Sequence, residues 1–238
     1  MALTAYLTQT KRLLQNPGAP TSLYSDADLT SWINTARGQL SGEADCIRSI
    51  VSLTLSSSTR IYAFPSSGLE SGIKAVFNVR MITLVSGSGA IFLTPRPWEW
   101  FNRYLLSVAT PASGSPTIWT QYKQGTSGNL YFDPIPNTTF TATLDTVCQP
   151  IDLVDDSTAE AIPYPWTDCV PYFAAYLALL SAQSQVRQAD ANRMFERYEE
   201  FVERARRMSV PRVLPSQYDQ SVVFPTPVPQ AVPQGAQS

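Results

Sequence analysis

The order of local patterns constrains this chain most, because helical periodicity at both ends encloses a long region with strand-like alternation. Apolar residues recur at three- and four-residue steps from Leu3 to Leu14, and Asn16-Pro17-Gly18 ends this pattern. A second helical pattern, Leu29 to Leu40, follows Ser25, a serine N-cap with an acidic residue three positions later. Residues 2–45 are therefore predicted to form a helical hairpin.

The middle of the chain has the composition of strands. Residues 47–149 are rich in Val, Ile, Thr, Phe and Tyr and are interrupted by clusters of Gly, Pro and Ser. Strands are predicted over Arg48–Leu55, Ala75–Val85, Ile118–Lys123, Asn129–Phe132 and Thr139–Leu144. The third and fourth flank a Gly- and Ser-containing loop typical of a hairpin, and one short helix is predicted over Trp98–Tyr104.

Helical periodicity returns after Pro165. The segment Tyr172–Leu180 is apolar on more than one side, so it is predicted to be the most buried helix. A last amphipathic helix is predicted from about Gln188 to Met208. Each terminal helical pair is too small to bury its own apolar stripe, which favours packing of the two pairs into one bundle.

The predicted fold class is therefore α+β. Residues 1–46 and 151–208 are predicted to form a helical bundle, into which residues 47–150 are inserted as an antiparallel β sandwich or barrel. The chain closes with an extended, proline-rich tail over residues 209–238.

The tail combines two opposed signals. Its six prolines exclude helix and favour extended or polyproline backbone. It also keeps apolar residues that a solvated tail has little reason to carry, so docking onto a partner is favoured over disorder. The predicted contact residues are Val210, Pro211, Val213, Leu214, Tyr218, Val222, Val223 and Phe224.

The absence of histidine excludes much chemistry. Without it there is no Ser-His or Cys-His dyad, and the commonest general base and zinc ligand is missing. Cys46, Cys148 and Cys169 form no CxxC pair, so neither a metal knuckle nor a redox motif is expected. Three buried free thiols are the favoured interpretation, with a Cys46–Cys148 or Cys148–Cys169 bridge left open. No catalytic, cofactor or metal site is predicted.

The charge balance argues against a protein that grips duplex DNA. The chain has 17 Lys and Arg against 19 Asp and Glu, which gives a formal net charge of -2. Charged residues make up only 15% of the chain, which indicates either a modest surface or a surface largely covered by partners. The first 18 residues lack the features of a signal peptide, and Tyr172–Leu180 is too short to span a bilayer, so a soluble protein is expected.

Two candidate sites have competing interpretations. The acidic residues Asp152, Asp155, Asp156 and Glu160 suit either a hydrolase built on carboxylates or a solvated linker before a helix, and the linker is favoured. The aromatic residues of the β region either form a platform for sugars or lie in the core, and the core is favoured. These aromatic residues are Trp98, Trp100, Trp119, Tyr122, Tyr131 and Phe132.

Three helical segments resemble phage head–tail connector proteins. Tyr24–Arg37 resembles their second helix, and Ala161–Asp168 followed by Val170–Tyr176 is similar to their third. Ala189–Phe195 followed by Tyr198-Glu199 is similar to the fourth. The helix–β–helix layout is also similar to the tail tubular protein A class of adaptor in short-tailed phages.

The resemblance implies a non-enzymatic structural protein at the head–tail junction of a virion, made in the host cytoplasm. It implies a ring of about twelve subunits under the portal protein. The β domain would face the tail nozzle or fibre proteins, and the tail would insert along the portal or a neighbouring subunit. DNA would pass transiently through the lumen, and no membrane contact is implied. The alternative is a carbohydrate- or receptor-binding module that uses the aromatic β domain.

Overall fold

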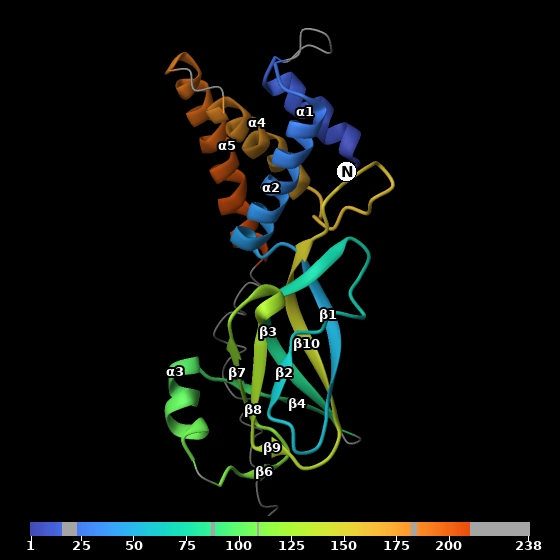
Figure 1. The fold of residues 1–238 in the computed structure, drawn as a ribbon, viewed down its shortest axis with the longest axis vertical. Helices are drawn as coiled ribbons and strands as arrows, with labels where there is room; N and C mark the ends of the chain where they lie inside the picture. Colours follow the sequence, from blue (N-terminus) through green and yellow to red (C-terminus); the bar gives the residue numbers. More distant parts are fainter. Residues whose placement is uncertain (16–22, 87–88, 109, 182–184, 210–238) are drawn as a thin grey trace, which may run out of the picture.

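The computed structural model describes residues 1–15, 23–86, 89–108, 110–181 and 185–209. Its described part is elongated, with α1, α2, α4 and α5 at one end and the sheets at the other (Figure 1). The class is α+β, as predicted. The proline-rich tail lies outside the described residues.

Four helices pack together at the first end. They are α1 (Leu3–Leu13), α2 (Asp26–Ala44), α4 (Val170–Ser181) and α5 (Gln185–Ser209), and a 3-10 turn over Trp166–Cys169 leads into α4. The predicted cap at Ser25 is confirmed, because its Oγ accepts a hydrogen bond from the Asp28 N–H at 3.1 Å. Helix α4 lies against the other three helices, so these four elements share one core.

The strands form two four-stranded sheets and one short pair. The first sheet is antiparallel and has the order β1 (Arg48–Leu55), β10 (Phe140–Pro150), β3 (Ile73–Ser86) and β4 (Gly89–Phe92). The second has the order β2 (Ile61–Ala63), β8 (Asn129–Asp133), β7 (Ile118–Tyr122) and β5 (Thr94–Pro95). The pair joins β6 (Ser113–Gly114) to β9 (Ile135–Pro136).

The sequence predicts an antiparallel β domain, but the sheets are not purely antiparallel. The pairs β5–β7 and β6–β9 are parallel. Each pair is formed by only two residues on either strand. A strand segment of two residues is too short to show an alternation of apolar and polar side chains, so the sequence gives no signal for these pairs. The predicted short helix begins as α3 (Trp98–Phe101) and continues as a π turn over Asn102–Leu106, while Gly125–Ser127 forms a 3-10 turn.

The segment after β10 ties the strands to the helices through a buried ion pair. Arg37 on α2 has no exposed surface, and its Nη2 lies 2.8 Å from Oε1 of Glu160. Arg37 also donates to the Ile151 carbonyl at 2.6 Å, while the Tyr6 hydroxyl donates to Glu160 at 2.8 Å. Because both charges are paired and their remaining bonding capacity is used, the joint between the two ends is fixed in one geometry.

Candidate partner interface

The tail residues marked for docking lie outside the described residues. They are Val210, Pro211, Val213, Leu214, Tyr218, Val222, Val223 and Phe224. The described part of the chain ends with α5, at Ser209. A docking role for these residues therefore stays a prediction.

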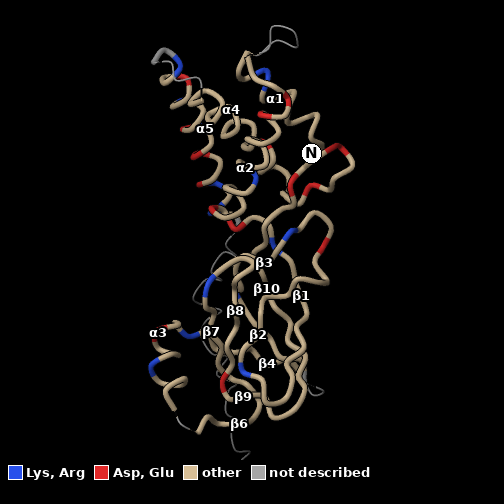
Figure 2. Tube along the Cα trace, in the orientation of Figure 1, with Lys and Arg blue, Asp and Glu red and all other residues tan. Residues whose placement is uncertain are grey.

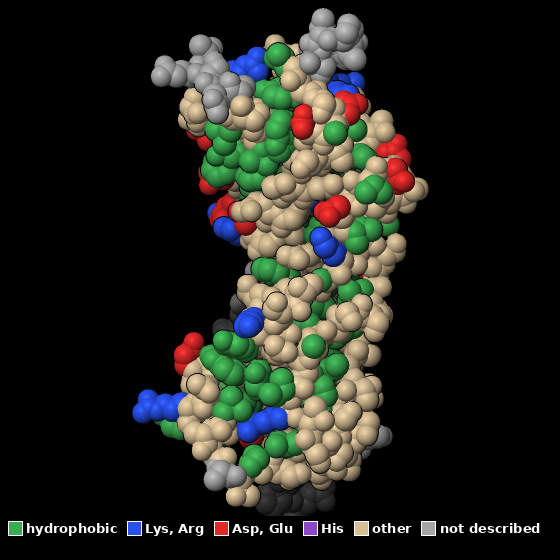
Figure 3. Space-filling view, viewed as in Figure 1, with side chains coloured by type: hydrophobic (Ala, Val, Ile, Leu, Met, Phe, Trp, Pro, Cys, Tyr) green, Lys and Arg blue, Asp and Glu red, His purple; other side chains and the backbone are tan. Residues whose placement is uncertain are grey.

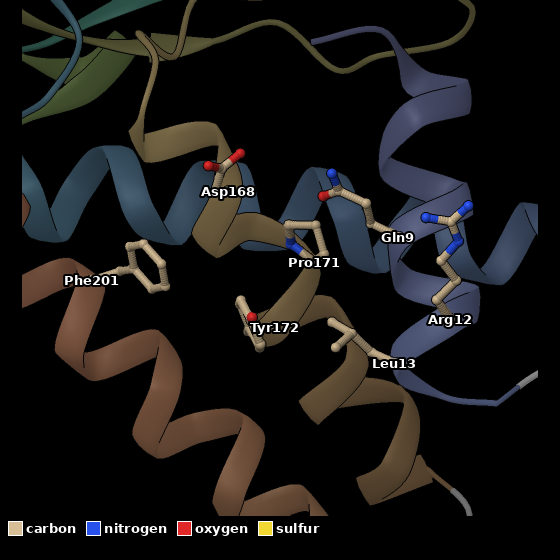
Figure 4. A pocket seen from close by; sticks show the side chains of 7 residues that line it. All are labelled: Gln9, Arg12, Leu13, Asp168, Pro171, Tyr172 and Phe201. Carbon is tan, nitrogen blue, oxygen red and sulfur yellow. The ribbon is translucent and has the colours of Figure 1, made fainter.

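A pocket of about 460 Å³ opens between α1 and α5, with the start of α4 as its floor (Figure 4). Tyr172 on α4 and Phe201 on α5 stack with their ring centroids 6.0 Å apart. The lining residues are Gln9, Arg12, Leu13, Asp168, Pro171, Tyr172 and Phe201. The pocket is open to solvent and joins an apolar floor to a polar side that includes Arg12 and Asp168, so it suits a protein segment with both apolar and charged side chains.

Among the described helices α4 has the largest buried share, as predicted, although it is not buried on all sides. Its alanines are fully buried, but Tyr172, Phe173, Tyr176 and Leu177 are only half-buried and Leu180 is 38% exposed. Aromatic rings of α5 partly cover this side of α4, through the pairs Tyr172–Phe201, Phe173–Tyr198 and Tyr176–Phe195.

The predicted aromatic platform divides into a buried and a surface group. Trp119 and Phe132 lie in the core, with 4% and 0% of their surface exposed, so the core interpretation holds for these two. Trp98 on α3 instead contacts Tyr122 and Tyr131, at ring-centroid distances of 4.3 and 4.9 Å. The surface group therefore forms where α3 lies against β7 and β8.

Trp100 extends this surface group on α3. Its ring lies 5.6 Å from that of Tyr104, which is 52% exposed, and the Arg96 guanidinium lies 5.1 Å from the Trp100 centroid. The sequence placed the aromatic residues in one region but could not separate core from surface, because the separation depends on how α3 docks. Exposed aromatic rings beside cations are suited to stacking against a partner.

The acidic segment is a solvated linker at Asp152, Asp155 and Asp156, as the sequence favoured, but the side chain of Glu160 is buried. Glu160 is held by Arg37 and Tyr6, and both Asp156 oxygens accept hydrogen bonds from Thr4 at 2.7 Å. These bonds lower the pKa of Asp156 and occupy a backbone N–H in the first turn of α1. Long-range pairing of this kind leaves no local sequence signal. Because Glu160 is committed to the joint, an acid–base role for it is unsupported.

The cysteines are buried and free, as predicted. Burial raises the pKa of Cys46 and of Cys169 to about 12, so neither thiol is activated. Among the described residues, no group of three or more His, Cys, Asp or Glu is placed to hold a metal ion. No helix in that part of the chain is long and apolar enough to cross a membrane.

The distribution of charge also points to protein contacts. Figure 2 shows acidic and basic residues interspersed along α5 and few charges over the sheets. Three ion pairs lie along α5, Arg193–Asp190, Arg197–Glu200 and Arg207–Glu203. A mixed pattern of this kind lacks the one-signed surface that would grip a nucleic acid.

A family model describing the SU10 adaptor protein matches residues 1–225 of the 238-residue chain. The chain belongs to the SU10 adaptor protein family. This membership supports a structural role as a phage head-to-tail adaptor, with a place in the virion, and speaks against an enzymatic role.

One solved structure similar to this adaptor is a chain from the neck of an empty GTA particle. The two chains are 16% identical, the match covers 79% of this chain and 87% of that chain, and the TM-score is 0.27. A TM-score of this size does not establish a shared fold. A comparison with curated proteins gives no match.

The packing of this adaptor's α4 agrees with its composition. No residue from Val170 to Ser181 is charged. A helix that is apolar all round must be covered on all sides, either by its own chain or by a partner. In the described chain α1, α2 and α5 all contact α4, and Leu180 near its end stays partly exposed.

Proposed function

We propose that this protein is a structural head-to-tail adaptor that forms a ring of about twelve subunits between the phage portal protein and the tail. The observation that carries the proposal is the family match over residues 1–225. The finer likeness to the tail tubular protein A class belongs to the same proposal and rests on the helix–β–helix layout.

The chemistry of the chain supports a channel through which DNA passes without being read. The sequence has no histidine, and its charges nearly balance at -2. A lumen that held DNA tightly through many Lys and Arg contacts would hinder its passage, because each neutralised phosphate adds affinity. A near-neutral adaptor leaves DNA free to move during packaging and ejection.

In this proposal the helical end and the β end of the molecule contact different proteins of the virion. The helical end packs around the ring axis beneath the portal, and the β end faces the tail nozzle or the tail fibres. The tail residues Val210–Phe224 insert along the portal or a neighbouring subunit. An extended segment adds contact area with little folded mass, and weak contacts repeated around a ring bind tightly together.

Mass photometry of the purified protein, alone and mixed with a portal complex, tests this function. The expected result is a portal-bound species whose added mass is that of about twelve 26.2 kDa chains. A protein that never joins the portal over a wide concentration range would contradict the adaptor function.

The aromatic surface on α3 supports a second candidate function, which is recognition of a carbohydrate or a receptor. The observation that favours it is the exposure of Tyr104 and Tyr122 beside Trp98 and Trp100. Sugar rings stack on such surfaces. Titration with host glycans should then change tryptophan fluorescence, and the Trp100→Ala variant should remove that change.

A further inference from the structure

The sheet β1-β10-β3-β4 has an open edge on each side. Strand β1 is hydrogen-bonded to β10 alone and β4 to β3 alone, and no other described backbone group bonds to either strand. A free edge presents N–H and C=O groups without partners, and another strand can pair with them. The backbone chemistry of both edges therefore suits an added β-strand.

Neither edge is protected against such pairing. The part of β1 from Ile50 to Leu55 has no charged residue and no proline, and Ile50 is 72% exposed. All residues of β4 are exposed and uncharged, and Phe92 is 67% exposed. Figure 3 shows few charged side chains on the face of the β end that is in view. Sheets commonly protect an exposed edge with Lys, proline or a bulge, so these two edges are suited to a partner.

Strand β4 and the second half of β1 lie at the same level of the sheet. The register of the three ladders defines rows of residues that cross all four strands. One row is Ser52, Thr143, Thr83 and Phe92, and another is Thr54, Thr141, Val85 and Ala90. A strand that continued these rows beyond β1 would therefore stand level with β4.

The free backbone groups of β1 follow from its ladder with β10. The Cys148 N–H donates to the Ile47 carbonyl at 2.9 Å. Hydrogen-bonded and non-bonded residue pairs alternate along an antiparallel ladder. The N–H and C=O groups of Ser52 and Thr54 therefore point away from β10, toward the open edge.

The free backbone groups of β4 follow in the same way from its ladder with β3. The Leu93 N–H donates to the Ile82 carbonyl at 2.9 Å. By the same alternation, Ala90 and Phe92 direct their N–H and C=O groups away from β3. The residues that end each row, at β1 and at β4, are thus the ones whose backbone groups are free.

We propose that β4 of one copy of this chain pairs with Ser52–Leu55 on β1 of a second copy. The proposal rests on the proposed ring, and it names the contact between neighbouring subunits at the β end. Strands β1, β10 and β3 run along the long axis of the molecule (Figure 1), and the copies of a ring share the direction of that axis. Strand direction alternates across the four strands, so β4 of one copy runs antiparallel to β1 of the next.

The second copy is the occupant because it meets the conditions of level, direction and bonding together. Rotation about an axis parallel to the strands keeps every strand at its level and in its direction. It therefore brings Phe92 of one copy opposite Ser52 of the next, and Ala90 opposite Thr54. The free backbone groups of both pairs then point into the contact. A contact between two different edges is heterologous, and a heterologous contact repeated by rotation closes into a ring.

Cysteine cross-linking of the full chain on the portal complex tests the contact. The native thiols are all buried, so a short bis-maleimide reports mainly on introduced cysteines. The double variant Thr54→Cys/Ala90→Cys should give a ladder of covalent oligomers. Each single variant should give at most background, because a head-to-tail contact never places two copies of one residue together. Thr8→Cys/Ala90→Cys, whose first site is exposed on α1, is the matched control and should give no ladder.

Three outcomes of the cross-linking would count against the proposals. Dimers from a single variant, or the absence of a ladder in portal-bound rings, would overturn the strand contact. A ladder from Thr54→Cys/Val222→Cys in its place would assign the edge of β1 to the tail and overturn the contact as well. Failure of the wild type to join the portal would refute the adaptor function itself.

Lysines on the edge of β1 provide the second test, because a charged side chain on an edge strand opposes pairing with another strand. Ser52→Lys/Thr54→Lys should keep a thermal midpoint close to that of the wild type, since both side chains are exposed. It should need at least about tenfold more protein to load the portal. Thr141→Lys, an exposed site on the inner strand β10, is the matched control and should load normally. Normal loading by the double variant refutes the contact and leaves the adaptor function standing.

Discussion

Arg37 and Glu160 are separated by 123 positions in the sequence, yet they form the most buried ion pair in the described structure. The guanidinium donates through Nε and Nη2 to the carboxylate, and its Nη1 donates to the Ile151 carbonyl. Removing one partner from such a pair leaves an uncompensated buried charge, which costs far more than an exposed pair contributes.

Replacement of Glu160 by Gln is therefore expected to lower the free energy of unfolding by about 3–5 kcal/mol. Urea denaturation measures this change. Arg37→Met/Glu160→Leu, which removes both charges, should be less destabilised than Glu160→Gln. The exposed variant Arg197→Ala should unfold like the wild type. A loss in Glu160→Gln no greater than in Arg197→Ala would show that the pair does not hold the joint.

The buried thiols make stability depend on alkaline pH. An unfolded thiol ionises near its ordinary pKa of 9.0, whereas burial raises the pKa of Cys46 and Cys169 to about 12. Between these values the unfolded state releases protons that the folded state keeps, so stability is complete below pH 9 and falls as pH rises toward 12. Burial also raises the pKa of Tyr6 and Tyr198, which adds to the decline.

Urea unfolding at pH 8 and pH 10 tests this dependence. The wild type should lose stability between the two values, and Cys46→Ala/Cys169→Ala should lose less. A thiol reagent at pH 8 should modify the folded protein slowly and the urea-unfolded protein quickly. Equal rates in the two states would contradict the burial of the thiols.

At the scale of elements, long periodic segments were predictable and short ones were not. The strand over Arg48–Leu55 was predicted with its observed bounds, and the last helix, Gln185–Ser209, differs from the predicted Gln188–Met208 by three residues at its start and one at its end. Such segments carry their own pattern of burial. The strands β2, β4, β5, β6 and β9 have two to four residues, too short to show a clear alternation, and all of them except β4 pair with strands that are distant in sequence.

The candidate interface was less predictable than the fold, for the same reason. The lack of charge in α4 can be read from the sequence. How much of α4 stays exposed depends on the packing of α1, α2 and α5 around it. The same applies to Glu160, whose role is set by Arg37 on a distant helix.

The N-cap of α2 provides a test of local sequence signals. Ser25 accepts from the Asp28 N–H and donates to the Asp28 carboxylate at 2.7 Å. Ser25→Ala should lower the free energy of unfolding by about 1 kcal/mol, as measured by urea denaturation. Ser25→Asn retains an acceptor and should stay close to the wild type. Equal losses in both variants would mean that the capping bond does not stabilise α2.

At the scale of the whole molecule, the tail and the folded part are expected to act separately. Truncation after Met208 removes the predicted docking residues and leaves all but the last residue of the described chain. We expect an unchanged circular dichroism spectrum and thermal midpoint, but weaker loading onto the portal by mass photometry. Undiminished assembly of the truncated protein would contradict the docking role of the tail.

The arrangement of β1 and β10 has a consequence for how such adaptors diversify. The chain leaves the helices into β1 and returns to them from β10, and these strands are neighbours, with Arg48 opposite Val147. The joint after β10 makes its bonds with α1 and α2. We therefore expect recombination between related phages to exchange the β end as a cassette, with one breakpoint near residue 47 and the other near 150. A breakpoint beyond Glu160 would instead separate it from its arginine and yield chimeras that fold poorly.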